Sequence, residues 1–161
     1  MTTFCETLAL IEEKAESKGA GLGHQQMLFY DFGIVFNSWL GFGSQQSSSD
    51  NLQGPIWLKS IFRGFVYTNK KSDSRAILEV YKNGTAPVNL IASYTFPASG
   101  ALRISKSDFN VTVNPVDGIA VYMKEDPGAQ TNQRPQEPRV WLFFEKAEDA
   151  TFGEFVTPTP P

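Results

Sequence analysis

Cysteine and histidine, the residues that most often serve as nucleophile, base or zinc ligand, are each present only once in this sequence. The chain has one cysteine, Cys5, and one histidine, His24. A nucleophilic Ser or Cys usually needs a positioned base, most often histidine, and a structural zinc site needs four ligands rich in Cys and His. We therefore interpret Cys5 as a small apolar residue and His24 as an exposed linker residue. We expect no catalytic residue, metal or cofactor, and predict that the chain is not an enzyme.

Two long polar loops could supply oxygen ligands for a bound ion. These loops contain Asp50, Asn51 and Asp126. They lack the dense spacing of acidic residues and glycine that is typical of an EF-hand. Trp39 lies just before the first loop and offers a ring on which a sugar could stack. Trp39, Asp50, Asn51 and Asp126 are therefore our candidates for a ligand-binding loop surface.

The charge balance and the hydropathy of the chain argue against several partners. There are 14 Lys and Arg against 17 Asp and Glu, a net charge of −3. A nucleic-acid-binding domain usually carries a basic excess, so no nucleic-acid partner is expected. No apolar run approaches 18 residues, and the first residues lack the basic region of a signal peptide. We therefore expect no membrane partner and synthesis in a host cytoplasm.

Aromatic residues are abundant, at 13% of the chain, whereas charged residues make up only 19%. In the last predicted strand, Val140, Leu142 and Phe144 line one face. Trp141 and Phe143 line the other face. A two-sheet sandwich buries only one face of each sheet. The surplus apolar surface indicates contact between subunits, with a helix docked on the sheet or a sugar-stacking surface as alternatives.

Residues 3–18 contain the helical pattern of the sequence. Thr3 and Glu6 fit a capping box at its start, and apolar residues at 4-3-4 spacing line one face. These apolar residues are Phe4, Leu8, Ile11 and Ala15. A helix of about two heptads is not stable alone in water. The apolar face is therefore predicted to pack either on its own domain or between subunits.

From residue 27 onward the pattern is that of short β-strands. Seven or eight strands are predicted in residues 27–37, 56–68, 75–82, 88–96, 101–105, 109–114, 119–123 and 139–145. Gly64 predicts a bulge, and Asn83-Gly84 predicts a hairpin turn. The predicted fold class is mainly β, an antiparallel, jelly-roll-like β-sandwich with a short N-terminal α-helix.

The chain is predicted to have three regions. Residues 1–23 hold the helix and a Gly-rich connector, residues 24–149 the β-sandwich domain, and residues 150–161 an extended Pro-rich tail. The two long loops are residues 43–53 and 125–138. Loops of this length are usually either functional or mobile.

Four segments within residues 56–146 resemble a known class of protein. They are residues 78–84 (LEVYKNG), 109–114 (FNVTVN), 118–122 (GIAVY) and 138–144 (PRVWLFF). They resemble the jelly-roll virion structural modules of tailed bacteriophages, and are similar to C1q/TNF-like sandwiches. In those modules a strand ending in Lys-Asn-Gly precedes a paired strand, and a Gly-Asp turn leads into a later strand. Here that turn is instead Asp117-Gly118.

The resemblance implies a non-enzymatic virion structural protein, a capsid decoration, cement or head-fibre protein that assembles on the particle. It implies a homo-oligomer, with a trimer favoured, and contact with other virion proteins such as the major capsid protein. The alternatives are a tail, baseplate or neck component, or a carbohydrate-binding adhesin module that binds a host-surface glycan. The predicted interface residues are Phe4, Leu8, Ile11, Ala15, Trp141 and Phe143.

Overall fold

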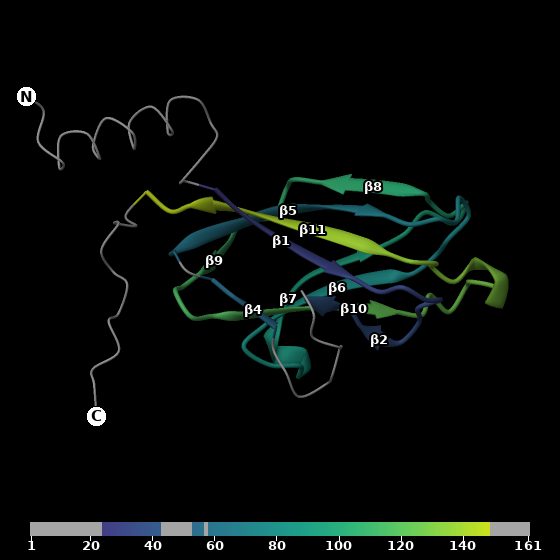
Figure 1. The fold of residues 1–161 in the computed structure, drawn as a ribbon, viewed down its shortest axis with the longest axis horizontal. Helices are drawn as coiled ribbons and strands as arrows, with labels where there is room; N and C mark the ends of the chain where they lie inside the picture. Colours follow the sequence, from purple (N-terminus) through teal and green to yellow (C-terminus); the bar gives the residue numbers. More distant parts are fainter. Residues whose placement is uncertain (1–23, 43–52, 57, 149–161) are drawn as a thin grey trace, which may run out of the picture.

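The computed structural model describes residues 24–42, 53–56 and 58–148, which form a mainly β structure of two antiparallel sheets. The sheets lie one above the other and face each other across a shared core (Figure 1). The predicted helix at residues 3–18, the tail at residues 150–161 and most of the first long loop lie outside the described residues.

The large sheet contains six of the strands that the structure describes. Its order is β3-β1-β11-β5-β8, and β9 also pairs with β5. The strands are β1 (His24–Tyr30), β3 (Gly41–Phe42), β5 (Ser60–Thr68), β8 (Arg103–Lys106), β9 (Val111–Val113) and β11 (Arg139–Lys146).

The small sheet contains the other five strands of the described residues. Its order is β2-β10-β6-β7, and β4 also pairs with β10. The strands are β2 (Ser38–Trp39), β4 (Gln53–Pro55), β6 (Ile77–Lys82), β7 (Leu90–Thr95) and β10 (Gly118–Lys124). Two 3-10 turns, η1 (Pro87–Asn89) and η2 (Thr131–Gln133), lie in the connections.

The core lies between the sheets and follows the period-two alternation of each strand. In β11, Val140, Leu142 and Phe144 are fully buried, as the sequence pattern predicts. The small sheet contributes Leu78, Val80, Ile119, Val121 and Met123 to the same core. The apolar alternation thus explains which face of each sheet turns inward.

The bulge predicted at Gly64 is confirmed. In the pairing of β5 with β11, Gly64 lies opposite Phe143, but Phe62 lies opposite Phe144, so Arg63 is an extra residue in β5. The extra residue shifts the alternation by one position. Phe62 and Phe65, three residues apart, are consequently both fully buried.

The hairpin predicted around Asn83-Gly84 is also confirmed, because β6 and β7 pair antiparallel. The connection is longer than that dipeptide, however. Residues 87–89 form η1, with Pro87 at its start, and β7 begins at Leu90. Val88, predicted to lie in the strand, is 89% exposed in this turn.

The strand predicted over residues 27–37 is too long. β1 ends at Tyr30, because Asp31 accepts a hydrogen bond from the Gly33 N–H at 2.9 Å and turns the chain. The following segment pairs with residues 135–138 instead, through Val35 N–H to Pro135 O at 2.9 Å. Residues 31–37 therefore form a loop that is fastened to the second long loop.

Candidate interaction surfaces

The outer face of the large sheet carries an apolar row that crosses three neighbouring strands. Leu28 of β1 lies opposite Trp141 of β11, and Trp141 lies opposite Val66 of β5. Phe143, two residues after Trp141, lies on the same face. All four side chains are half-buried. We call Leu28, Val66, Trp141 and Phe143 the large-sheet face.

Charged and polar side chains border the large-sheet face at one end. Arg63 donates from Nε to Oε2 of Glu145 at 2.7 Å, and from Nη1 to Oδ1 of Asn110 at 3.0 Å. An apolar centre with a polar rim is typical of a protein–protein contact. The structure thus brings together Trp141 and Phe143, the two predicted interface residues that it describes.

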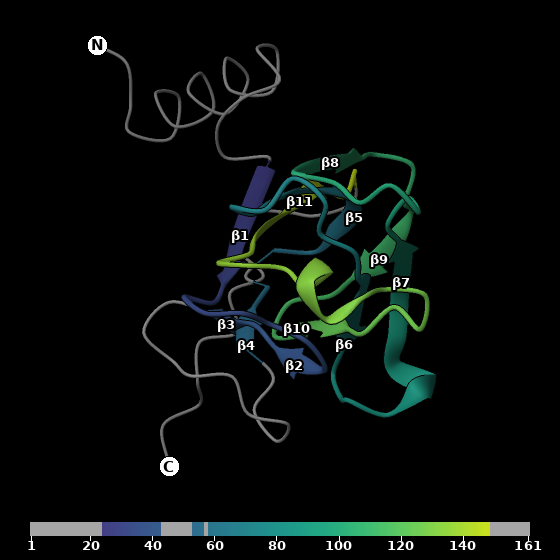
Figure 2. The same ribbon diagram turned by 90° about the vertical axis from the view of Figure 1, so that its right-hand side faces the viewer.

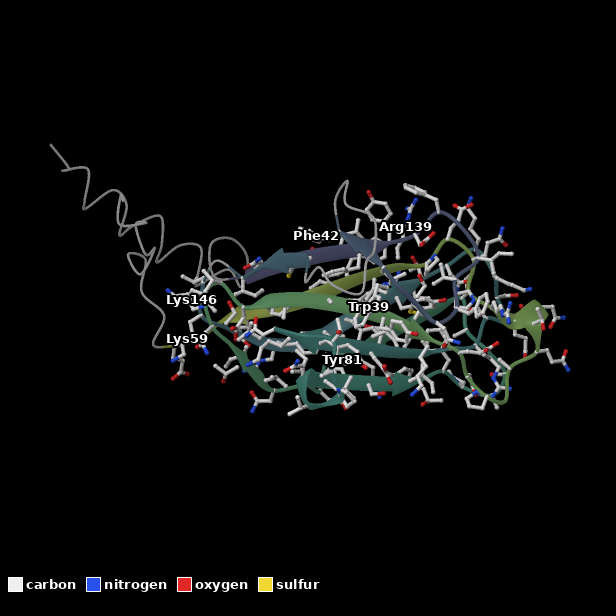
Figure 3. The ribbon with its side chains drawn as sticks, turned by 90° about the horizontal axis from the view of Figure 1, so that it is seen from below. Trp39, Phe42, Lys59, Tyr81, Arg139 and Lys146 are labelled. Atoms are coloured by element: carbon white, nitrogen blue, oxygen red, sulfur yellow. The ribbon has the colours of Figure 1, made fainter. Side chains whose placement is uncertain are left out.

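Trp39 lies elsewhere, on the outer face of the small sheet, which Figure 3 views directly. It belongs to β2 rather than to a loop, and it contacts Tyr81 and Tyr122 with ring centroids 5.1 and 4.8 Å away. The Tyr81 hydroxyl donates to Oε2 of Glu79 at 2.7 Å, and Nζ of Lys124 lies 3.6 Å from Oε1 of Glu79. Burial, and then the bond to Glu79, raise the pKa of Tyr81 to about 12.

The geometry of these rings limits what the Trp39 cluster can bind. The Trp39 ring is inclined by 65° to Tyr81 and by 51° to Tyr122, so the three rings do not form one flat platform. Both Tyr81 and Glu79 are buried. The cluster therefore stabilises the outer face of the small sheet, and its half-buried Trp39 and Tyr122 rings are the parts that a stacking ligand could contact.

Asp126 lies just after β10 and is held by Arg75 and by a backbone N–H of its own loop. Its Oδ2 accepts from Nε and Nη2 of Arg75 at 3.1 and 2.8 Å, and its Oδ1 accepts from the Gly128 N–H at 2.9 Å. The Gly128 bond, and then Arg75, lower the pKa of Asp126 despite its burial. This position favours a structural role over ligand binding.

The loop of residues 31–37 carries an exposed apolar group that the sequence analysis did not single out. Phe32, Ile34 and Phe36 are 76%, 67% and 40% exposed. The signal was present in the sequence, as apolar residues at every second position on both sides of Gly33. The same alternation predicts a continuing strand, in which one set of alternate residues would be buried.

The fold and these surfaces define a mainly β, antiparallel two-sheet protein with apolar patches outside its core. In the described residues no His, Cys, Asp and Glu side chains gather as a group of three that could hold a metal ion. None of the helices in that part of the chain is long and apolar enough to span a bilayer. No protein-family model matches the chain, and no curated protein sequence matches it. The remaining candidates, Phe4, Leu8, Ile11, Ala15, Asp50 and Asn51, lie outside the described residues.

Proposed function

We propose that the chain is a non-enzymatic structural protein of a bacteriophage virion. In this proposal it is a capsid decoration, cement or head-fibre protein that forms an oligomer, most favourably a trimer, on the particle. The observation that carries the proposal is the large-sheet face. Trp141 and Phe143 are large apolar side chains on the side of the sheet turned away from the core. A second copy of the chain would remove this surface from water.

The strand pairing supports the jelly-roll part of the proposal. A jelly roll is an eight-stranded antiparallel ribbon, rolled so that the first strand pairs with the last, the second with the seventh, and so on inward. Here β1 pairs with β11, β2 with β10, β5 with β8, and β6 with β7. In this scheme β2 and β4 together fill the place of the second strand, because both pair with β10. The short strands β3 and β9 are additions to the large sheet.

The physical demands of particle decoration agree with these features. A decoration protein stabilises a shell by burying surface between subunits, and many copies turn weak contacts into firm attachment. A trimer needs either one face that meets its two copies around a threefold axis or two different faces that fit each other around the ring. The row Leu28–Trp141–Val66 supplies one such face, because it runs across adjacent strands of one sheet.

A carbohydrate-binding adhesin module is the second candidate. The Trp39 cluster supports it, because an indole ring, a tyrosine hydroxyl and a carboxylate lie together on an outer face. The inclination of the rings weighs against it. A glycan array tests this candidate, with Trp39→Ala as the variant that should lose any glycan binding.

Light scattering on the size-exclusion peak of the full-length chain tests the oligomer. We expect a mass near three times 17.9 kDa for the wild type. Trp141→Ser should lower that mass, and Leu8→Asp should do the same if the N-terminal segment shares the interface. Val88→Ser is the matched control, because Val88 is apolar and 89% exposed but lies in η1, away from the large-sheet face.

Two outcomes would contradict this proposal. A wild-type monomer would contradict the oligomer, and an unchanged mass for Trp141→Ser would show that the large-sheet face is not the interface. Circular dichroism of each variant separates dissociation from unfolding. The presence of the chain in the particle is tested by mass spectrometry of purified virions from the phage that encodes it. We expect many copies of the chain per virion, alongside the coat protein.

A further inference from the structure

The end of the molecule formed by residues 31–37 presents three apolar side chains to water. Phe32, Ile34 and Phe36 occupy alternate positions and are exposed, whereas Val35 between them is 2% exposed and anchors the loop in the core. We call Phe32, Ile34 and Phe36 the apolar tip. Phe32 also contacts Tyr30, with ring centroids 5.0 Å apart. Three large apolar side chains exposed on one short loop form a local apolar patch, and such patches often mark sites of interaction.

The backbone of this loop is hydrogen-bonded to other groups of the protein, mostly in residues 135–138. Asp31 N–H donates to Pro138 O at 3.2 Å, and Val35 N–H donates to Pro135 O at 2.9 Å. Gly33 N–H donates to the Asp31 carboxylate, and Gly33 O accepts from Glu137 N–H at 2.8 Å. Because these backbone groups already have partners, the Phe32 and Ile34 side chains can enter the interface without leaving them unpaired, provided that the Asp31 carboxylate stays among the polar headgroups.

The charged side chains near the apolar tip are mostly paired with one another. Lys70 lies 2.6 Å from Glu137, and Arg134 lies 3.1 Å from Glu125. Arg134 also stacks on the Phe36 ring, with its guanidinium carbon 3.4 Å from the ring centroid. Asp31 in the loop and the exposed Arg139 at the start of β11 add one charge of each sign at this end. This end of the molecule therefore presents apolar side chains among roughly equal numbers of opposite charges, which matches the zwitterionic headgroups of a neutral lipid better than a strongly charged partner.

The apolar tip lies at one end of the two-sheet structure. Tyr30 and Arg139 pair at this end of β1 and β11, whereas His24 and Glu145 pair at the opposite end. Figure 2 looks onto the apolar-tip end, with the turn at residues 131–133 toward the viewer. The chain enters β1 and leaves β11 at the far end. A molecule held through the segments beyond β1 and β11 would thus present the apolar tip outward.

We infer that the apolar tip inserts into the headgroup and upper acyl region of a lipid bilayer, with Phe32 and Ile34 as the inserting side chains. Two observations favour a lipid surface over a protein pocket. The exposed side chains all belong to one short loop at an end of the molecule, and a fluid bilayer needs no complementary pocket to receive them. The paired charges leave the apolar side chains as the source of attraction. The inference goes beyond the proposed function and departs from the expectation of no membrane partner.

Co-sedimentation of the full-length chain with phosphatidylcholine vesicles tests this inference. We expect the wild type to sediment with vesicles of this lipid alone, and its binding to change little between low salt and about 0.5 M salt, because paired charges are not the source of attraction. The double variant Phe32→Ser/Ile34→Ser should bind at least about tenfold more weakly, since it removes most of the inserted apolar surface.

The matched control is the double variant Val88→Ser/Val116→Ser. These valines are 89% and 81% exposed, and they lie in turns outside the loop of residues 31–37. The control should bind vesicles like the wild type. No wild-type sedimentation, equal binding by the Phe32/Ile34 variant, or binding that disappears at high salt would each overturn the inference.

Light scattering on the same samples separates this inference from the proposed function. The Phe32/Ile34 variant should keep the wild-type mass while losing vesicle binding. If instead its mass falls and no form of the protein binds vesicles, the apolar tip is a contact between copies of the chain and the lipid inference is wrong. If the wild type is monomeric but binds vesicles through the apolar tip, the proposed oligomer fails and the lipid inference stands.

Discussion

Val116 holds a backbone conformation that β-branched residues rarely adopt. Its φ is 67°, and it follows Pro115 in a turn closed by the Asp117 N–H, which donates to Asn114 O at 3.1 Å. A positive φ at the third position is what a type II turn requires, and glycine or asparagine normally occupies it. An 81% exposed valine gains little from packing in return.

Val116→Asn should therefore stabilise the protein. Left-handed backbone costs a residue other than glycine about 1–2 kcal/mol, and asparagine tolerates it best. We expect the free energy of unfolding in urea to rise by about 1 kcal/mol. Val88→Asn is the control, because Val88 is equally exposed but does not have a positive φ; its effect should stay within about 0.5 kcal/mol. A loss of stability in Val116→Asn would show that the turn depends on the valine side chain.

Asp126 forms a largely buried ion pair with Arg75. Its side chain is 9% exposed and that of Arg75 is 17% exposed. Asp126→Ala leaves a largely buried guanidinium without its carboxylate, so we expect a loss of about 2 kcal/mol at pH 7. Glu145→Ala breaks the exposed pair with Arg63, 47% and 40% exposed, and should cost less than about 1 kcal/mol.

The contribution of Asp126 should also depend on pH in a defined direction. Its pKa is lower in the folded state than the ordinary value of 3.8. The stabilisation is therefore complete at pH values above 3.8 and is lost as the pH falls through the lowered folded-state pKa. Urea unfolding at pH 7 and at about pH 2.5 should show the difference between wild type and Asp126→Ala shrinking at acid pH. A constant difference would mean that the carboxylate acts by packing alone.

At the scale of elements, β5 is shaped by Gly64. A Cβ at this position would overlap the carbonyl oxygen of Lys106 and lie 2.8 Å from the Cα of Ser107. Backbone atoms cannot move aside cheaply, so Gly64→Ala should lower the melting temperature and cost about 2 kcal/mol or more. In Gly33→Ala the added Cβ meets only Oδ1 of Asp31 at 3.6 Å, and little change is expected. Equal stability of the two variants would contradict this role of Gly64.

The elements that the sequence predicts well are those whose signal is local. Alternation in residues 139–145 predicts which side of β11 faces the core, and Gly64 predicts the bulge. Residues 31–37 were wrongly predicted to continue a strand, because alternate apolar residues have the same pattern whether a sheet or only water lies beside them. The Asp31–Gly33 turn ends β1 locally, whereas the contact that holds the loop in place, Val35 N–H to Pro135 O, joins positions about a hundred residues apart along the chain and leaves no local pattern.

At the scale of the whole molecule, the class of fold was predictable and the surfaces were only partly so. Short runs of alternating apolar and polar residues indicate antiparallel sheets. Apolar residues on the outer side of β11, Trp141 and Phe143, indicate an apolar surface outside the core, which is the large-sheet face. The partners of Trp141 on that face, Leu28 and Val66, depend on register between distant strands. The role of Asp126 also depends on a residue distant in the sequence. Its pairing with Arg75 favours a structural role over the predicted ligand-binding role.

The pairing of β11 between β1 and β5 has a consequence for how the protein is made. The ribosome delivers β1 early, but its main partner, β11, is among the last described residues to be synthesised. At about 5–20 residues per second, β1 waits roughly 5 to 20 s for that partner. During this time the edge of β1 and the aromatic side chains of β1 stay exposed on the nascent chain. We therefore expect the yield of folded protein in the cell to depend on protection of β1 from aggregation until β11 has been made.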